Sequence, residues 1–436
     1  MHIAQPWPNQ TDSPQIKVNP TMEIFSLMPN RLNPNCRDRT TNNAGPPMSL
    51  FEYPKNCKKY SRWHSILSKV LVNRSKDSSH IYMYIIGLGT AAPTHRHLQR
   101  DGWEAVQKWP GFSHLKPRSR AIIKKILCSD NGIEARHLVL ETLAEAFDPT
   151  PDVLQQRFTT HAPALAAEAA RRAMKNAGCH PEEIDAVIIS TCTGYLCPGL
   201  TSYVSELLGL RQNIFALDLV GQGCGAAVPN LRAGEAILAT GRAKRVLSVC
   251  VEVCSAAFYL DDDPGVLISA CLFADGAGAA VLANEPLPGR RRVKWTFTDS
   301  RLVTSERDTL RFGHSHGMLR NILQPQVPQV AGDLAAKLFN ESLVAAGVKR
   351  EQITGWILHA GGRDVILALR KTLELSADDV RHSSAVLREF GNLSSPTVYF
   401  VLERAWADTI PDGLWWMSAF GAGFSCHGAF LEVQAA

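Results

Sequence analysis

The sequence predicts a duplicated α/β fold, in which two similar halves each alternate strands with helices. Two observations carry this prediction. Beyond residue 80, short apolar runs typical of buried strands alternate with alanine-rich helical stretches, a pattern that favours α/β architecture. One such unit also occurs twice, with the second copy 169 residues after the first. Internal repetition of this kind indicates two related halves.

The repeated unit is a helix that ends at a glycine, a short linker and a strand. The first copy reads from Asn176 to Ser190 and the second from Ala345 to His359, after helical stretches at 162–177 and 331–346. Gly178 and Gly347 are placed as the helix ends, because glycine adopts the left-handed conformation that closes a helix. Two such halves facing each other would bring strand ends and helix starts to a shared centre.

The chain is divided into three parts by composition. Residues 1–80 are rich in Asn, Pro, Ser and basic residues and show little periodicity, so we expect a poorly ordered N-terminal extension there. A strand beginning at Met83 opens the first half, which is assigned to 81–290, and the second half is assigned to 291–436. Small-residue turns at 272–282 and 420–430 close the two halves and support the duplication.

Bulk composition excludes several classes of protein. The 436 residues are 45% hydrophobic and 20% charged, as in globular chains, and a net charge of +5 does not indicate a nucleic-acid binder. No apolar run reaches membrane-spanning length. The eleven cysteines lack the paired spacing of a zinc site. We therefore expect no metal, no membrane insertion and a reducing, cytoplasmic compartment.

One cysteine stands between a predicted strand and a predicted helix. The apolar run 214–220 predicts a buried strand, and 225–240 predicts a helix that Gly241 ends. Cys224 lies between them, where unpaired backbone N–H groups and the helix dipole favour the reactive thiolate. A buried structural cysteine is the alternative, and the local sequence leaves both interpretations open.

Two further motifs complete a Cys, His and Asn set. His359 ends the repeated strand, in His-Ala-Gly-Gly, and Asn392 lies in Gly-Asn-Leu-Ser-Ser, at the position that the repeat pairs with Cys224 to within one residue. These three residue types suit acyl chemistry: a thiolate takes an acyl group, an imidazolium keeps the sulfur ionised, and His and Asn donate to a developing oxyanion.

In order, the nucleophile motif, the His-x-Gly-Gly motif, the Gly-Asn-x-Ser-Ser motif and the late Gly421-Ala-Gly423 turn resemble those of type III polyketide synthases. These are the chalcone and stilbene synthase family of condensing enzymes, and the chain is similar to bacterial-like members from about Tyr82 to Val433. The resemblance implies a thiolase-like duplicated fold with layers αβαβα and a homodimer. It also implies acyl-CoA and malonyl-CoA as substrates, without a metal or a bound organic cofactor.

The resemblance assigns roles by position. Cys224 would accept the acyl group, while His359 and Asn392 would bind the thioester oxygen and promote malonyl decarboxylation. Phe273 would be a gatekeeper beside the cysteine, although without the resemblance its own context favours a core aromatic. Repeated condensation would give pyrone or resorcinol-type products. The family's second gatekeeper phenylalanine would fall near Asn321.

The positions that align with the family's substrate pocket carry mostly small side chains, from which we expect a long or widened tunnel and a medium or long fatty acyl-CoA starter. These positions are Cys192, Thr193, Cys197, Cys254, Ala257 and Ser269, with Ser394 and Gly421. Glu252 and Ser394 match a set linked to cyclisation choice, in which Cys192 replaces a threonine.

A basic segment could receive the CoA phosphates, although an ordinary solvated helix face is the alternative. Its residues are Lys116, Arg118, Arg120, Lys124 and Lys125.

Three other interpretations compete with the synthase, and one of them, a catalytically inactive binding protein, fits poorly with an intact Cys, His and Asn set. A ketoacyl synthase III-like enzyme would perform one condensation with an acyl carrier protein, and a Cys-His-Asn thioester hydrolase would need no malonyl-CoA. The Gly-Gln-Gly-Cys and Gly-Asn-Leu-Ser-Ser contexts favour the polyketide synthase. The sequence leaves open the starter, the number of extensions, the ring type and the role of residues 1–80.

Overall fold

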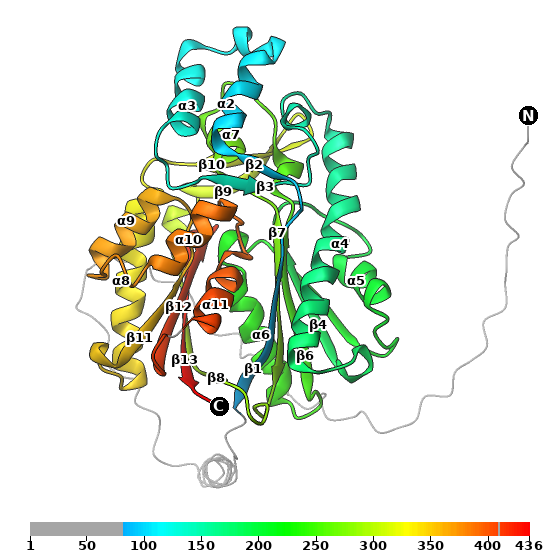
Figure 1. The fold of residues 1–436 in the computed structure, drawn as a ribbon, viewed down its shortest axis with the longest axis vertical. Coiled ribbons are helices and arrows are strands. Elements are labelled where there is room, and N and C mark those ends of the chain that lie inside the picture. Colours follow the sequence, from blue (N-terminus) through cyan, green and yellow to red (C-terminus); the bar gives the residue numbers. More distant parts are fainter. Residues whose placement is uncertain (1–81, 409) are drawn as a thin grey trace, which may run out of the picture. The chain divides into compact units, whose positions relative to one another are not determined.

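A nine-stranded mixed sheet organises the part of the chain that the computed structural model describes, residues 82–408 and 410–436 (Figure 1). The extension predicted at 1–80 lies outside these residues. The strands of the large sheet are β1 (Met83–Ala91), β4 (Ala186–Thr191), β5 (Phe215–Val220), β6 (Arg245–Glu252), β7 (Gly276–Ala283), β8 (Arg292–Leu302), β11 (Ile353–Leu358), β12 (Gly413–Gly421) and β13 (Ser425–Gln434). Two small antiparallel pairs are β2 (Arg96–Leu98) with β3 (Ala135–His137), and β9 (Leu310–Ser315) with β10 (Met318–Leu323). The helices are α2 (Gln99–Lys108), α3 (Pro117–Cys128), α4 (Pro151–Ala177), α5 (Leu200–Leu208), α6 (Ala227–Ala239), α7 (Pro264–Leu272), α8 (Val327–Ala346), α9 (Arg363–Thr372), α10 (Arg381–Phe390) and α11 (Thr397–Ala407).

The strand order confirms the duplication. The sheet runs β11-β12-β13-β8-β1-β7-β6-β4-β5, with β8 and β1 antiparallel at its centre. Outward from that centre each half repeats one pattern: an antiparallel pair, a second antiparallel pair and a parallel pair. Only β5 has no counterpart among the described strands, since α10 occupies the matching position in the second half.

The repeated helix–strand unit has the same local structure in both halves. Helices α4 and α8 end at Gly178 and Gly347, which have φ of 62° and 66°. A short 3-10 turn follows in each copy, and its third residue accepts a 2.8 Å hydrogen bond from the backbone N–H three positions earlier. Strands β4 and β11 begin just after these turns. The predicted helix ends and strands are confirmed.

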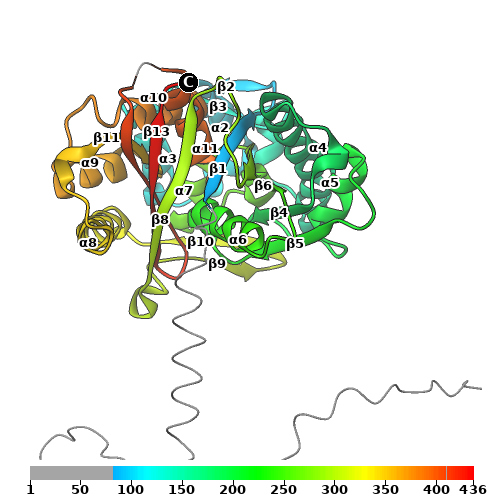
Figure 2. The same cartoon turned by 90° about the horizontal axis from the view of Figure 1, so that it is seen from below.

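Helices α6 and α11 lie between the two halves of the sheet, and each contacts strands of both halves. The five layers are therefore outer helices, one half of the sheet, the central helices, the other half of the sheet and outer helices. Helices α4 and α5 cover the first half of the sheet, and α8 and α9 cover the second, on the opposite side of the molecule (Figure 2). The two central helices meet at Ser248 of β6, which receives a 2.9 Å hydrogen bond from Asn230 of α6 and lies 3.0 Å from the Tyr399 hydroxyl of α11. A buried apolar core surrounds these helices.

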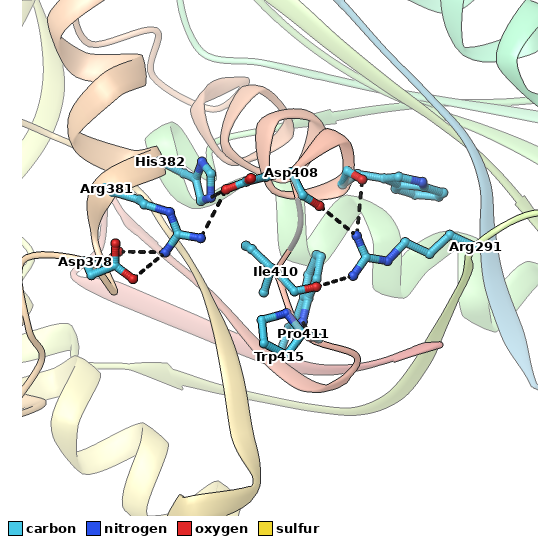
Figure 3. Close-up of polar contacts among 9 residues, drawn as sticks. Arg291, Asp378, Arg381, His382, Asp408, Ile410, Pro411 and Trp415 are labelled. Carbon is cyan, nitrogen blue, oxygen red and sulfur yellow. Dashed lines mark hydrogen bonds and ion pairs between the residues drawn. The ribbon is translucent and has the colours of Figure 1, made fainter. Parts of the chain in front are cut away.

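Arg291, just before β8, fixes the connection from α11 to β12. It donates to the backbone carbonyls of Trp406, Asp408 and Ile410, and its guanidinium lies 5.0 Å from the Trp415 ring centroid (Figure 3). These contacts satisfy carbonyls at the end of a helix, where backbone acceptors lack partners. Arg291 thereby connects the segment after α11 to the start of β8, the strand that pairs with β1 of the first half.

The burial predicted for 214–220 is wrong. The strand forms as β5, but it lies at the sheet edge, and Phe215 and Val220 are 54% and 59% exposed. An apolar run predicts a strand but cannot distinguish an interior strand from an edge strand that another surface covers. The helix predicted at 225–240 is confirmed as α6, preceded by a 3-10 turn at Gly223–Gly225.

Within the described residues, no helix has the length and apolarity needed to cross a membrane. All nine cysteines in this part of the chain are free.

Candidate active site

Cys224 lies in the turn between β5 and α6, and that turn fits tightly against the turn after β12. Gly221 and Gly223 adopt φ of 85° and 58°, which glycine allows without strain. A Cβ at Gly421 would lie 2.3 Å from the backbone oxygen of Gln222. Gly421 therefore supports the nucleophile turn and does not line the cavity described below, while its predicted role in substrate binding stays a prediction.

The Gly-Asn-Leu-Ser-Ser loop connects the cysteine to the His-Ala-Gly-Gly segment. Ser394 donates a 3.1 Å hydrogen bond from Oγ to Cys224 Sγ. Asn392 Nδ2 donates to the Gly361 carbonyl at 3.0 Å, and its Oδ1 accepts from the Ser394 N–H at 2.9 Å. Cys224 precedes α6 and Asn392 precedes α11, so the two central helices place them at matching starts.

His359 follows β11 and is almost fully enclosed. Its side chain belongs to a residue that is 1% exposed, and its ring meets Phe420 edge-on with centroids 4.9 Å apart. Its Nδ1 has no hydrogen-bond partner among the described residues. The described residues also show no hydrogen bond between this ring and Cys224 Sγ. A free ring nitrogen in a buried site can serve an incoming ligand.

Desolvation favours the neutral forms of Cys224, which is half-buried, and of His359, which is buried. Desolvation raises the pKa of Cys224 to about 12, although the hydrogen bond from Ser394 opposes this rise. Desolvation lowers the pKa of His359 to about 3. The thiolate and imidazolium predicted from the sequence are therefore not the favoured resting forms. The loss of hydration outweighs the stabilisation of a thiolate by the N-terminus of α6.

Phe273, at the end of α7, is tied to the Asn392 loop through the backbone. The Ala274 N–H donates to the Asn392 carbonyl at 2.8 Å, and the Asn392 N–H donates to the Leu272 carbonyl at 3.0 Å. Arg136, which is buried, donates to the Phe273 carbonyl at 3.1 Å. Sequence reasoning missed Arg136, whose isolated position in a basic chain gives no signal.

A buried carboxylate connects Cys192 to the same loop. Glu252 accepts hydrogen bonds from Thr193 Oγ1 at 2.9 Å, from the Cys192 N–H at 3.0 Å and from Ser395 Oγ at 2.6 Å. Cys192 Sγ also lies 3.3 Å from Glu252 Oε1 and 3.7 Å from Ser394 Oγ. Desolvation raises the pKa of Glu252. These contacts make one connected polar set beside the cysteine.

A cavity of about 20 Å³ adjoins Ser394, with room for about one water molecule. Its lining comprises Thr193, Cys254, Ala257, Phe258, Val266, Ser269, Phe273, Phe312, Asn321 and Ser394. Five of the predicted substrate-binding residues therefore line it together with Phe273. Cys192 does not line the cavity and instead contacts Glu252. Cys197 is exposed and also lies outside the cavity lining.

At about 20 Å³, this cavity is too small to hold the long acyl chain that the sequence predicts. Phe258, Val266 and Phe312 contribute bulky side chains to the wall and occupy volume that the small residues leave. Phe312 on β9 pairs with Asn321 on β10, so an aromatic side chain does reach this part of the cavity, from the neighbouring strand. The sequence could have suggested Phe312 only if the hairpin register had been known.

Two family models match most of the described chain. The model for the N-terminal domain of chalcone and stilbene synthases matches residues 72–286, and the model for the C-terminal domain matches 314–428. The chain belongs to the chalcone and stilbene synthase family. It is a type III polyketide synthase, an acyltransferase-type enzyme that condenses malonyl-CoA.

Relatives of this type III polyketide synthase include 3,5-dihydroxyphenylacetyl-CoA synthases. The chain is 29% identical over 330 residues to the one from Streptomyces toyocaensis, covering 73% of this chain and 82% of the relative. It is 34% identical over 246 residues to the one from Amycolatopsis balhimycina, covering 55% of this chain and 65% of the relative.

Solved structures agree on the thiolase-like fold. PKS-I from the brown alga Ectocarpus siliculosus has a TM-score of 0.73 and 26% identity, over 82% of this chain and all of that chain. A fungal type III polyketide synthase, ORAS, has a TM-score of 0.70 and 22% identity, over 81% of this chain and all of that one. The predicted fold class is confirmed.

The basic segment of this polyketide synthase forms helix α3 and the residue before it. Lys116, Arg118, Lys124 and Lys125 are exposed, while Arg120 is half-buried. Lys116 pairs with Asp262 at 3.7 Å, and Lys124 lies 6.0 Å from the Trp103 ring centroid. Helix α3 packs on α7, the helix that ends at Phe273, so this cationic face is connected to the site through one helix.

Proposed function

We propose that this enzyme extends an acyl-CoA starter with malonyl-CoA, in repeated decarboxylative condensations, through a thioester on Cys224. The observation that carries the proposal is the convergence of Cys224, Ser394, Asn392 and the Gly361 carbonyl in one chain of hydrogen bonds. His359 stands two residues before Gly361. This arrangement supports Cys224 as the nucleophile, with Asn392 and the nearby His359 as donors to an oxyanion.

The loading step transfers one proton and one acyl group. The neutral His359 imidazole takes the thiol proton of Cys224, and the sulfur attacks the thioester carbonyl of the starter. The CoA thiolate then leaves and is protonated, which forms the acyl-Cys224 thioester. The imidazole is neutral before the transfer because burial lowers its pKa to about 3, and a base this weak accepts the proton only as the sulfur attacks the carbonyl.

The extension step uses the same donors. Malonyl-CoA loses CO2, and the electron pair moves to its thioester oxygen, which His359 N–H and the Asn392 amide stabilise. One Asn392 N–H already bonds Gly361, so the second remains for this oxygen. The enolate carbon attacks the acyl-Cys224 carbonyl and expels the sulfur. The longer chain, now on CoA, returns to Cys224 for the next cycle.

The starter proposed from the small lining residues Cys254, Ala257 and Ser269 is a fatty acyl-CoA, giving pyrone or resorcinol-type products. A second candidate is a short starter such as acetyl- or malonyl-CoA, because the cavity of about 20 Å³ must enlarge less for a short acyl group than for a long chain, which displaces Phe258, Val266 or Phe312. The relatives are named 3,5-dihydroxyphenylacetyl-CoA synthases, and the acyl group in that name carries no long alkyl chain, which supports the second candidate.

A homodimer is proposed from the exposed edge strand. Phe215 and Val220 expose apolar side chains on β5, the last strand of the large sheet among the described residues, and Tyr195, a few residues before α5, is 71% exposed. Such an edge is a ready surface for a second copy.

The enzyme is further proposed to need no metal or organic cofactor. In residues 82–408 and 410–436, no three His, Cys, Asp or Glu side chains are grouped to hold a metal.

The test is a mass-spectrometric product scan. The purified full chain is incubated with malonyl-CoA and starters from acetyl- to palmitoyl-CoA, with Cys224→Ala as control. Products that grow by ketide units and vanish in the control support the proposal, and the accepted starters decide between the two candidates. One unit added per starter would point instead to single condensation, and free acid without malonyl-CoA to a hydrolase.

A further inference from the structure

Asn321 places an amide inside the cavity wall, held there by its neighbours. The residue is 5% exposed and lines the cavity with Ser394, the hydrogen-bond partner of Cys224. Its hairpin is pressed on the start of α7, since a Cβ at Gly265 would lie 2.3 Å from the Asn321 carbonyl oxygen. An ion pair between Arg320 and Asp263 fixes the same contact.

Hydrogen bonds determine which way the amide points. Ser269 Oγ lies 2.7 Å from the Gly265 carbonyl, which can only accept, so the serine proton is used there. Ser269 must therefore accept from Asn321, which places Nδ2 at 2.7 Å from it. Asn321 Oδ1 is left facing away from Ser269, and it is buried without a partner among the described residues.

A buried acceptor without a partner is unfavourable, and a ligand hydroxyl would satisfy it. An aliphatic chain supplies no such donor, and a ketone oxygen only accepts. Extension by malonyl units does supply one, because 1,3-dicarbonyl groups enolise. Groups near Ser394 and Cys224 are the most recently added units, so an enol hydroxyl would form in this region.

We infer that Asn321 Oδ1 binds an enol hydroxyl of the polyketide chain growing on Cys224, and so holds the chain for further extension. The inference rests on the proposed function and adds a specificity-determining residue to it. Asn321 acts after the first condensation, since the starter carries no enol. Its loss should release shorter products without slowing the loading of Cys224.

The test compares Asn321→Leu, which has similar size and no acceptor, with Ile322→Val on the same strand. Intact-mass spectrometry follows acylation of Cys224 by the starter, and product analysis gives the ratio of chains released after one or two extensions to longer ones. We expect unchanged acylation and about a tenfold rise in this ratio for Asn321→Leu, comparable to the loss of one hydrogen bond. Ile322→Val should match wild type.

A ratio within twofold of wild type in Asn321→Leu would overturn the inference, as would an equal rise in Ile322→Val. If Asn321→Leu does not fold, Asn321→Ala decides, because it removes Oδ1 without adding volume to the cavity wall. A shift towards early release supports the role, and an unchanged ratio rejects it. Wild-type protein that forms no malonyl-dependent product would reject the proposed function itself, and the role of Asn321 with it.

Discussion

Ser394 donates a 3.1 Å hydrogen bond to the sulfur of Cys224, and it is the strongest influence in this site that favours the thiolate. Desolvation acts in the opposite direction and raises the pKa of this thiol to about 12. The reactivity of Cys224 in the free enzyme is therefore set by a balance between one hydroxyl and an enclosed environment. Both can be changed separately by mutation.

Replacing Ser394 with alanine should raise the pKa of Cys224 further. At pH 8 the thiolate is a small fraction of Cys224, and it increases tenfold with each pH unit below the pKa. A hydrogen bond to a charged group is worth about 1.5–3 kcal/mol, so alkylation of Cys224 by iodoacetamide should slow about tenfold or more. Peptide mapping assigns the label, with Cys224→Ala as control. An equal or faster rate at pH 8 in Ser394→Ala would contradict this account.

Acid stability should depend on His359. Burial lowers its folded-state pKa to about 3, below the ordinary value of 6.5. The neutral ring is compatible with the fold and the charged ring is not, so its contribution is fully present above pH 6.5. It is lost as the pH falls towards 3, at about 1.4 kcal/mol per unit of pKa difference.

We expect His359→Gln to show a shallower loss of unfolding free energy between pH 6.5 and 4 than wild type, measured by urea unfolding. Some dependence will remain, since burial also lowers the pKa of His427 to about 4. His180→Gln, at the exposed turn before β4, serves as the control and should follow wild type. Identical pH profiles for wild type and His359→Gln would show that His359 is not buried neutral.

Gly421→Ala should disrupt the nucleophile turn. The added Cβ would approach the backbone oxygen of Gln222 to 2.3 Å and the Gly225 nitrogen to 2.6 Å, and neither atom can move without shifting Cys224. We expect a lower melting temperature and loss of Cys224 acylation. Gly102→Ala on α2 is the matched control, because its Cβ would meet Leu127 at an ordinary 3.4 Å. Alanine there favours the helix and should leave both readouts intact.

The halves of the fold were predictable because each step of the repeat has a local cause. Gly178 and Gly347 close helices by adopting positive φ, and the strands that follow are apolar over a strand's length. The position of β5 was not predictable in the same way. Its apolar residues look the same whether a neighbouring strand or another surface covers them, and α10 in the second half gives no strand to compare.

The positions of Cys224, His359 and Asn392 were predicted, whereas the protonation states of Cys224 and His359 were not. Motifs place these residues at strand ends and helix starts, which the fold brings together. Protonation depends on how completely the site is closed, and Phe420 and the Gly421 turn contribute to that closure from a distant segment. The closed cavity has the same origin, because Phe312 reaches it through a hairpin register that sequence patterns do not define.

Charge on the β5 edge should separate a dimer into monomers. Val220→Glu places a carboxylate at a side chain that is 59% exposed in the single chain, so the fold of one copy should tolerate it. If two copies cover this strand, the buried charge is costly, and the sedimentation coefficient should fall to that of a monomer. Val344→Glu on α8 is the control, since Val344 is 84% exposed and far along the chain from β5. The edge is rejected as the contact if wild type and Val220→Glu sediment alike, and a change in Val344→Glu as well would indicate a general effect of charge.

Because β5 leads directly into the turn of Cys224, the monomeric variant should also acylate more slowly if pairing of the edge stabilises that turn.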